Sequence, residues 1–311
     1  MKRAVFTGGA LAASFVSAAG AQTPATLPAV RVAMPAVDAA SQGYYALDKG
    51  FFKKAGLNAE ILTVAAGATV AAAVAGGAAE FGQSNLSSIC SAHERGLPFV
   101  AVAGSNMFVA KTHQSQLVVA PNAPFREAKD LNGKTLGVAG LKNITEVAFD
   151  LWMDTHGGDY KSVKVLEVPF SAMADAVATG RIDAVMMTEP ELSGALEKKR
   201  VRIFSTPMES IGMKFLFGVW FTTLAYAKAN PQVVKAFASA MAEAADWANR
   251  NQGESAKILE SHTGVTMGAN AARVLFANKL DVKQIQPVID ASAKYGALKA
   301  TFPASQLLAA D

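Results

Sequence analysis

The sequence predicts a two-lobed α/β protein in which each lobe is a mostly parallel sheet flanked by helices. Short apolar strands alternate with helical segments twice along the chain, and parallel strands need such helical connections. Residues 73–82 (AVAGGAAEFG) also resemble residues 176–185 (AVATGRIDAV) without a gap. Chance similarity between alanine-rich stretches is the alternative, but the matching order of elements on both sides favours a repeat. With 311 residues, 51% of them hydrophobic, the chain has enough apolar material for two lobes.

The chain begins with the pattern of an export signal. A positive start at residues 1–3 precedes an apolar run at 4–16 and small residues that end in an A-G-A triplet at 19–21. This pattern predicts a secretory signal peptide over residues 1–21, cleaved after Ala21, and a periplasmic mature protein. An N-terminal anchor helix is the alternative, but the apolar run is shorter than the about 20 residues that span a bilayer.

The elements of the first lobe follow from apolar runs bounded by glycine, proline and polar residues. We expect strands at 30–34, 60–64, 80–82 and 99–103, and helices at 42–52, 68–76 and 86–95. The stretch at 61–79 carries no charge and is nominally long enough to cross a membrane. Its interrupting glycines argue instead for a strand, a loop and a helix.

The second lobe repeats the pattern, and the chain then returns to the first. We expect strands at 117–120, 135–138, 163–168 and 182–186, and helices at 143–155 and 171–179. A long apolar strand at 215–227 carries the chain back. An alanine-rich helix begins at Pro231, with Phe237, Met241 and Trp247 toward the core, and the remainder of the chain is expected to be helical and to pack on the first lobe.

The connectors set the boundaries of the lobes. Lobe I is assigned residues 22–110 and 222–311, lobe II residues 115–215, and the hinge crossings residues 105–116 and 214–224. Two crossings between two α/β lobes predict a hinged pair with a cleft between them.

Composition and missing motifs exclude several function classes. The net charge of +4 is spread without a basic run, which argues against a nucleic-acid partner. The single cysteine, Cys90, rules out an internal disulfide, and a buried thiol is favoured over a nucleophile paired with His93. The histidines, at 93, 113, 156 and 262, form no metal-binding pair, and no nucleophile elbow, P-loop or dinucleotide fingerprint occurs. We therefore expect no catalytic residue, no metal and no cofactor.

Five segments, in order along the chain, resemble one family. They are YYALDKGFFKKAGL at 44–57, AGGAAEFG at 75–82, DLNGKTLGV at 130–138, GRIDA at 180–184 with Glu189-Pro190, and NPQVVKAF at 230–237. Together they resemble the periplasmic solute-binding proteins of nitrate, sulfonate and taurine ABC importers, which are related to thiamine-pyrimidine binders. The resemblance implies a venus-flytrap fold, a small-molecule ligand between two lobes, and delivery to an ABC permease in the inner membrane. We expect a monomer that is not an enzyme.

Candidate ligand-binding residues lie where strands end and helices begin. In open α/β sheets ligands bind beyond the carboxyl ends of the strands, and helix N-termini there expose N–H groups that suit carboxylate, sulfonate or nitrate oxygens. The candidates are Gln42, Tyr44, Gly67, Ala68, Thr69, Ser84, Asn85, Lys142, Asn143, Thr145, Phe170 and Glu189. Plain N-capping is the alternative role for the hydroxyl and amide side chains among them.

The chemistry of these corners leaves the ligand open. Lys142 is their one basic residue, so an anion would depend mostly on backbone N–H groups. Glu189 argues for an amine on the ligand, unless it caps a helix or faces solvent. Tyr44 and Phe170 suit an aromatic wall, whereas for Trp220 core packing is favoured. A sulfonate, taurine or nitrate fits this mixture, and so does a thiamine-precursor pyrimidine or another heterocycle. A pyrimidine-forming enzyme on the same fold would need a histidine in the cleft, and none falls in these corners.

Overall fold

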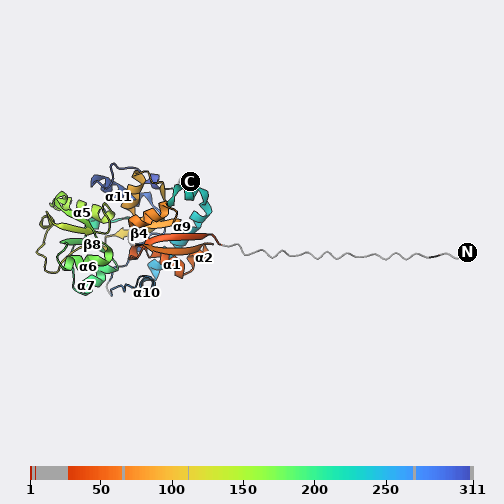
Figure 1. The fold of residues 1–311 in the computed structure, drawn as a ribbon, viewed down its shortest axis with the longest axis horizontal. Helices are drawn as coiled ribbons and strands as arrows, with labels where there is room; N and C mark the ends of the chain where they lie inside the picture. Colours follow the sequence, from red (N-terminus) through yellow and green to blue (C-terminus); the bar gives the residue numbers. More distant parts are fainter. Residues whose placement is uncertain (2–3, 5–26, 65–66, 111, 269–270, 309–311) are drawn as a thin grey trace.

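The chain folds around two separate β-sheets that form two lobes (Figure 1). The computed structural model describes residues 1, 4, 27–64, 67–110, 112–268 and 271–308, with the helical backbone alone for 67 and 68. Apart from residues 1 and 4, the predicted signal peptide at 1–21, with its cleavage point after Ala21, lies outside the described residues. Among the residues that are described, no helix combines the length and the apolar character that crossing a membrane requires.

The first sheet combines a parallel half and an antiparallel half. Its strands are β1 (Ala29–Pro35), β2 (Asn58–Val64), β3 (Phe81–Asn85), β4 (Phe99–Val109), β10 (Lys214–Thr223) and β11 (Leu275–Phe276), in the order β11-β4-β10-β3-β1-β2. β1 pairs in parallel with β2 and β3, whereas β10 is antiparallel to β3 and β4. The parallel half is the βαβαβ unit that the sequence predicts.

The second sheet has the same plan. Its strands are β5 (Ser115–Val119), β6 (Thr135–Val138), β7 (Lys164–Glu167), β8 (Ala184–Thr188) and β9 (Arg202–Ser205), in the order β7-β6-β8-β5-β9. β6 is parallel to β7 and β8, and β5 is antiparallel to β8 and β9. The prediction of two α/β lobes is confirmed, and the sheets are mixed because β5 and β10, the strands that follow the two connections, run antiparallel to both of their neighbours.

Helices cover both sheets. They are α1 (Gln42–Asp48), α2 (Phe51–Lys54), α3 (Gly67–Ala75), α4 (Leu86–Glu94), α5 (Ile144–Thr155), α6 (Phe170–Ala178), α7 (Glu191–Glu197), α8 (Leu224–Ala229), α9 (Pro231–Arg250), α10 (Gln252–Thr263) and α11 (Val282–Lys294). Short 3₁₀ turns are η1 (Asp38–Ala40), η2 (Ala128–Leu131), η3 (Tyr160–Ser162), η4 (Pro207–Ser210) and η5 (Ala304–Leu307).

Three expected elements differ from those observed. The helix expected at 42–52 is divided into α1 and α2, because Gly50 adopts φ +74°, which ends one helix and starts the next. The strand expected at 215–227 stops at Thr223, whose side chain accepts a hydrogen bond from the Tyr226 N–H and caps α8. The C-terminal part, expected to be helical, contains the short strand β11, which pairs with β4.

The chain changes sheet between the end of β4 and the start of β5, at residues 110–114, and again between β9 and β10, at residues 206–213. The expected hinge crossings at 105–116 and 214–224 therefore overlap β4 and β10. Where the lobes hinge remains a prediction.

The first lobe has an aromatic core under α9. The rings of Phe81 and Phe237 stack with centroids 3.9 Å apart, and Trp220 meets Phe237 edge-on at 5.6 Å. Phe237 and Met241 are fully buried, as expected, whereas Trp247 is only partly buried. Each such buried side chain contributes roughly 1.5–3 kcal/mol to folding, so these contacts hold α9 against the first sheet.

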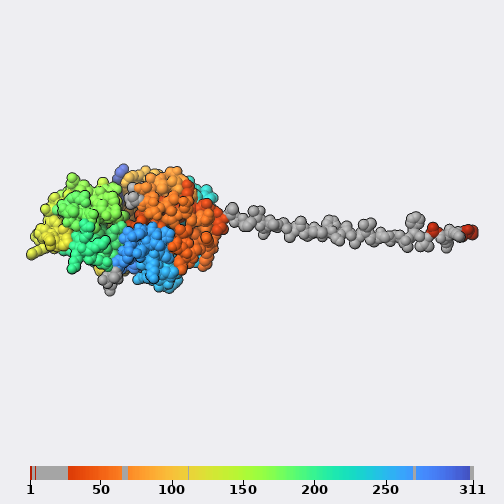
Figure 2. Space-filling model, turned by 60° about the horizontal axis from the view of Figure 1, so that its bottom comes forward, coloured from red at the N-terminus to blue at the C-terminus, as the bar shows by residue number. Residues whose placement is uncertain are grey.

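C-terminal segments of the first lobe also reach the second. The Tyr295 hydroxyl donates to Asp154 Oδ2 of α5 at 2.7 Å, and the Gly268 N–H donates to Ser193 Oγ of α7 at 3.1 Å. Figure 2 shows the light-blue part of the chain lying against both the orange first lobe and the green second lobe. The lobes are therefore in contact at two separate places, through α5 and through α7.

Candidate functional site

A cavity of about 500 Å³ lies between the two lobes. The first lobe contributes the segment after β1, one side of α3, the β3–α4 junction and the end of α4. The second contributes residues 139–145, the end of β7, the first residue of α6 and the end of β8, and Phe217 of β10 completes the wall. These are mainly the carboxyl ends of parallel strands, where such sheets bind ligands.

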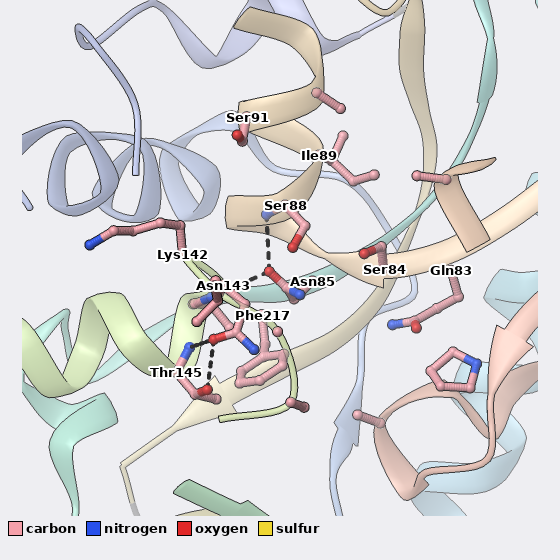
Figure 3. A pocket seen from close by; sticks show the side chains of 18 of the residues that line it. Gln83, Ser84, Asn85, Ser88, Ile89, Ser91, Lys142, Asn143, Thr145 and Phe217 are labelled. Carbon is pink, nitrogen blue, oxygen red and sulfur yellow. Dashed lines mark hydrogen bonds between the residues drawn. The ribbon is translucent and has the colours of Figure 1, made fainter. Parts of the chain in front are cut away.

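The β3–α4 junction places two polar side chains at this cavity (Figure 3). Asn85 is the N-cap of α4, and its Oδ1 accepts from the Ser88 N–H at 3.0 Å. Ser84 precedes it on β3 and is only 2% exposed. No described residue bonds to the Ser84 hydroxyl. A buried hydroxyl without a partner costs about 1–3 kcal/mol, so this group is available to a ligand.

The second lobe offers a matching junction between β6 and α5. Asn143 is the N-cap of α5, and its Oδ1 accepts from the backbone N–H groups of Thr145 and Glu146, both at 3.0 Å. The same oxygen accepts from the Thr145 hydroxyl at 2.7 Å. In Figure 3 the side-chain nitrogens of Asn143 and Asn85 point away from the helices that their oxygens cap. Neither nitrogen bonds to a described residue, so both can donate to a molecule in the cavity.

Lys142 lines the cavity, but its charge is already compensated. Its Nζ lies 3.0 Å from Glu146 Oε1 and 3.8 Å from Asp150 Oδ2, and its backbone adopts φ +56°. Burial raises the pKa of Asp150 to about 7, with the Lys142 ammonium opposing that rise. Lys142 therefore lines the cavity and also forms an ion-pair network with Glu146 and Asp150.

The polar groups of the lining divide by depth. The buried ones are neutral: Gln83, Ser84, Ser91, Asn143 and Thr145. The charged lining residues among those described are Arg95, Lys142 and Glu167, and all three are exposed. Apolar side chains, among them Ile89, Phe170, Met186 and Phe217, form the rest of the wall. The interior therefore suits a molecule that is mostly apolar and carries a group that accepts hydrogen bonds.

Six of the expected residues come together around the cavity: Ser84, Asn85, Lys142, Asn143, Thr145 and Phe170. Thr69 is exposed and does not line the cavity. For Gly67 and Ala68 the structure gives only their place in the first turn of α3. That any of these nine residues contacts a ligand remains a prediction.

Two other expected residues, Gln42 and Tyr44, lie in the core of the first lobe because their polar groups bond to other residues there. Gln42 is fully buried; its Nε2 donates to the Met241 carbonyl at 2.6 Å and its Oε1 accepts from Trp220 Nε1 at 2.7 Å. The Tyr44 hydroxyl is 2.9 Å from Thr63 Oγ1, and the Tyr44 ring stacks on the His262 ring with centroids 4.3 Å apart. Neither residue lines the cavity. Trp220 is core, as favoured from the sequence.

Glu189 is buried outside the cavity, in the contact between the lobes. Its Oε2 accepts from the Ser193 N–H at 3.0 Å, and its backbone oxygen accepts from the Asp38 N–H of the first lobe at 3.3 Å. Burial raises the pKa of Glu189 to about 7, against the hydrogen bonds from Ser193, and the Asp38 charge adds to the rise. In this place the carboxyl group bonds to the first turn of α7 and lies in the contact between the lobes, outside the described lining of the cavity. That Glu189 contacts a ligand amine remains a prediction.

Residues that the sequence does not single out form much of the apolar wall. Ala71, Ala72 and Ala75 present the small-residue side of α3 to the cavity, and Leu97 and Leu141 are exposed at its edge, one from each lobe. The uncharged alanine-rich sequence of α3 is a signal for such a face. Phe217 could not be found in this way, because it lies in an evenly apolar strand.

Histidines and metal-binding clusters, which enzymes often use, are not found among the described residues that line this cavity. Among its described lining residues there is no histidine, and the described residues contain no group of three or more histidine, cysteine or acidic side chains placed to hold a metal. Cys90 is a buried thiol, as favoured from the sequence, and burial raises its pKa.

Comparisons with known proteins agree with this architecture. Residues 40–255 match the model of the family described as NMT1/THI5 like, and no curated protein sequence matches the chain. The alkanesulfonate-binding protein SsuA of Xanthomonas axonopodis pv. citri, bound to MOPS, is similar with a TM-score of 0.74 at 16% identity, over 90% of this chain and 97% of that one.

Two further solved structures are similar. The periplasmic nitrate-binding protein NrtA of Synechocystis PCC 6803 has a TM-score of 0.76 at 15% identity, over 90% of this chain and 85% of that one. A Candida albicans protein described as having the generic periplasmic binding protein fold has a TM-score of 0.70 at 15% identity, over 89% and 93% of the two chains. At these identities the likeness shows the fold, which is that of periplasmic binding proteins.

Proposed function

Because this chain belongs to the NMT1/THI5-like family, we propose that it is a binding protein and not an enzyme, which captures a small organic solute or anion and delivers it to an ABC permease in the inner membrane. The observation that carries the proposal is the cavity between the lobes, since both lobes supply its hydrogen-bond donors. A ligand that bonds to both lobes draws them together, and closure is the property by which a carrier presents its loaded form to a permease.

The proposed ligands are small oxyanions and sulfonates such as an alkanesulfonate, taurine or nitrate. Two N-capped helices, α4 and α5, begin at the cavity, and helix N-termini favour negative charge. Solved proteins of the same fold include an alkanesulfonate binder and a nitrate binder. This supports the anionic class without selecting a member of it.

The second candidate is a thiamine-precursor pyrimidine or another heterocycle. Phe170 and Phe217 lie in the cavity wall, where they can pack on a flat ring. A pyrimidine-forming enzyme that consumes its own histidine is a weaker alternative, because His93, His113, His156 and His262 are not among the described lining residues.

The proposed location and assembly follow from the transport role. We place the mature protein in the periplasm, after removal of residues 1–21, as a monomer that meets the permease with a surface built from both lobes.

A thermal-shift screen tests the proposal, followed by calorimetry and recovery of each ligand from the complex. The panel comprises sulfonates, taurine, nitrate, bicarbonate, thiamine pyrimidines, flavins and aromatic acids. A receptor binds one molecule per chain and releases it unchanged. Chemical conversion of a bound compound would contradict the proposal.

A further inference from the structure

We propose that the preferred ligand is an organic monoanion with an uncharged apolar body and no amine, bound with its acidic group inward. This inference rests on the proposed function and narrows it. It separates alkyl and aryl acids from taurine, which carries an amine, and from nitrate, which has no apolar body.

The inner end of the cavity is built for an acidic group. Ser84 Oγ is buried without a partner among the described residues, and the side-chain nitrogens of Asn85 and Asn143 are unbonded to any of them. These donors come from both lobes and stand at the first turns of α4 and α5, and the N-terminal ends of helices carry partial positive charge. The donors can satisfy the oxygens of one carboxylate or sulfonate.

No matching group awaits a ligand amine. The acidic residue among the described lining is Glu167, which is exposed, and Glu189 is buried outside the cavity in its bond to Ser193. An ammonium group in the interior would be desolvated without a counter-charge, which is costly. Taurine should therefore bind less tightly than the sulfonate of equal length that lacks the amine.

The walls are built for an apolar body. Ala72 and Ala75 of α3 are exposed on the cavity side and leave room, while Ile89, Phe170 and Phe217 present apolar surface. A cavity of about 500 Å³ is many times larger than one water molecule, whose share of liquid volume is about 30 Å³. A few-atom ion such as nitrate would leave most of this space to water against apolar walls.

The edge of the cavity also carries apolar side chains. Leu97 of the first lobe and Leu141 of the second are among the exposed large hydrophobic side chains of the described chain, and both line the cavity. An apolar body directed outward from the inner donors would end between them. This placement fixes the orientation of the ligand, with its charge inward.

Calorimetry on the mature chain with a graded series tests the ligand class. The series is methane-, ethane- and butanesulfonate, benzenesulfonate, butyrate, benzoate, taurine and nitrate. We expect affinity to rise about fourfold per added methylene, and taurine to bind at least tenfold more weakly than ethanesulfonate. Taurine or nitrate binding as tightly as butanesulfonate overturns the inference and leaves the receptor function standing. Chemical conversion of a bound compound overturns the receptor function instead, and no binding across the series overturns the inference.

Variants test the orientation. Asn143→Asp keeps the helix cap, because aspartate caps as well as asparagine, but replaces the inward donor with a negative charge. We expect about a hundredfold loss of affinity for butanesulfonate with an unchanged melting temperature. Asn58→Asp makes the same charge change at the amino end of β2 and is the control. Arg95→Ala should cost at least tenfold less than Asn143→Asp, and the reverse order would place the acidic group at the edge and overturn the inference.

Ala72→Leu tests the place of the apolar body. The side chain is exposed on the cavity side of α3, and leucine is a good helix former, so the fold should tolerate it. We expect at least a tenfold loss for benzenesulfonate and little change for methanesulfonate. Equal effects on both ligands, or none on either, would overturn the assignment.

Discussion

The side-chain oxygen of Asn85 in the first lobe accepts a hydrogen bond from the backbone N–H of Ile144 in the second, at 3.4 Å. The same Oδ1 caps α4 through the Ser88 N–H at 3.0 Å. Beside it, the Ser87 hydroxyl donates to the Lys142 carbonyl at 3.3 Å. One side-chain oxygen thus bonds to the first turns of two helices in different lobes, and it can do so only while the lobes are together. Asn85 therefore links the cavity to the relative position of the lobes.

The first prediction separates the two ends of this side chain. Asn85→Ala removes both acceptor bonds and the free N–H group, so stability should fall by about 1 kcal/mol and affinity by roughly ten- to a hundredfold. Asn85→Asp keeps the acceptor bonds and should restore stability without restoring affinity for an anion. Urea unfolding and calorimetry measure the two effects. If Asn85→Ala and Asn143→Ala both left affinity unchanged for the tightest-binding ligand, the candidate site would be rejected.

The second prediction concerns closure of the lobes. A ligand that bonds to both lobes should reduce the radius of gyration, and it should raise stability by about 4 kcal/mol at a thousandfold excess over Kd. Small-angle scattering and chemical unfolding of the same samples provide the measurements. A scattering profile that stays the same while the melting temperature rises would argue against closure.

The caps of the site were predictable from local sequence. Asn85 and Asn143 each follow a strand and precede a helical pattern, and asparagine prefers the N-cap. Their position at the cavity then follows from the topology of parallel sheets. Gly50 was predictable only as a loosening of the helix, because its positive φ depends on how α2 packs.

Side-chain direction could not be read in this way. Gln42, Tyr44 and Glu189 also follow strands, yet tertiary contacts decide where they point. Gln42 bonds to Trp220, which is remote in sequence, and Glu189 bonds to the Ser193 N–H outside the described cavity lining. The sequence shows which residues lie at a junction between a strand and the next helix. Whether such a side chain points into the cavity depends on the residues it contacts elsewhere in the chain.

The third prediction uses this contrast between core and cavity. Gln42→Ala should leave the buried Trp220 Nε1 without its acceptor, at a cost of about 1–3 kcal/mol, while the Met241 carbonyl keeps its bond within α9; ligand affinity should be unchanged. Ser84→Ala should do the opposite, because its hydroxyl has no partner among the described residues to lose. Affinity should fall at unchanged or slightly higher stability. If the two variants changed stability and ligand affinity in the same way, the assignment of Gln42 to the core and Ser84 to the cavity would be refuted.

The last prediction follows from the buried carboxyl group of Glu189. Burial raises its pKa in the folded protein to about 7 from an ordinary value near 4.5. The folded state then holds a proton that the unfolded state has released between these two values, so stability should fall as pH rises from about 4.5 to 7 and level off above. The loss attributable to this group is at most about 3 kcal/mol. Asp150, with its pKa also raised to about 7, adds a similar trend.

Glu189→Gln isolates the contribution. The amide oxygen can still accept from the Ser193 N–H, and the neutral side chain no longer titrates beside Asp38. The stability of the variant relative to wild type should therefore increase between pH 5 and pH 8, while the contribution of Asp150 cancels in the difference. Glu60→Gln removes an exposed carboxylate of β2 and is the matched control. Urea unfolding at several pH values measures the difference, and a constant gap between wild type and Glu189→Gln would show that Glu189 is ionised in the folded protein throughout this range.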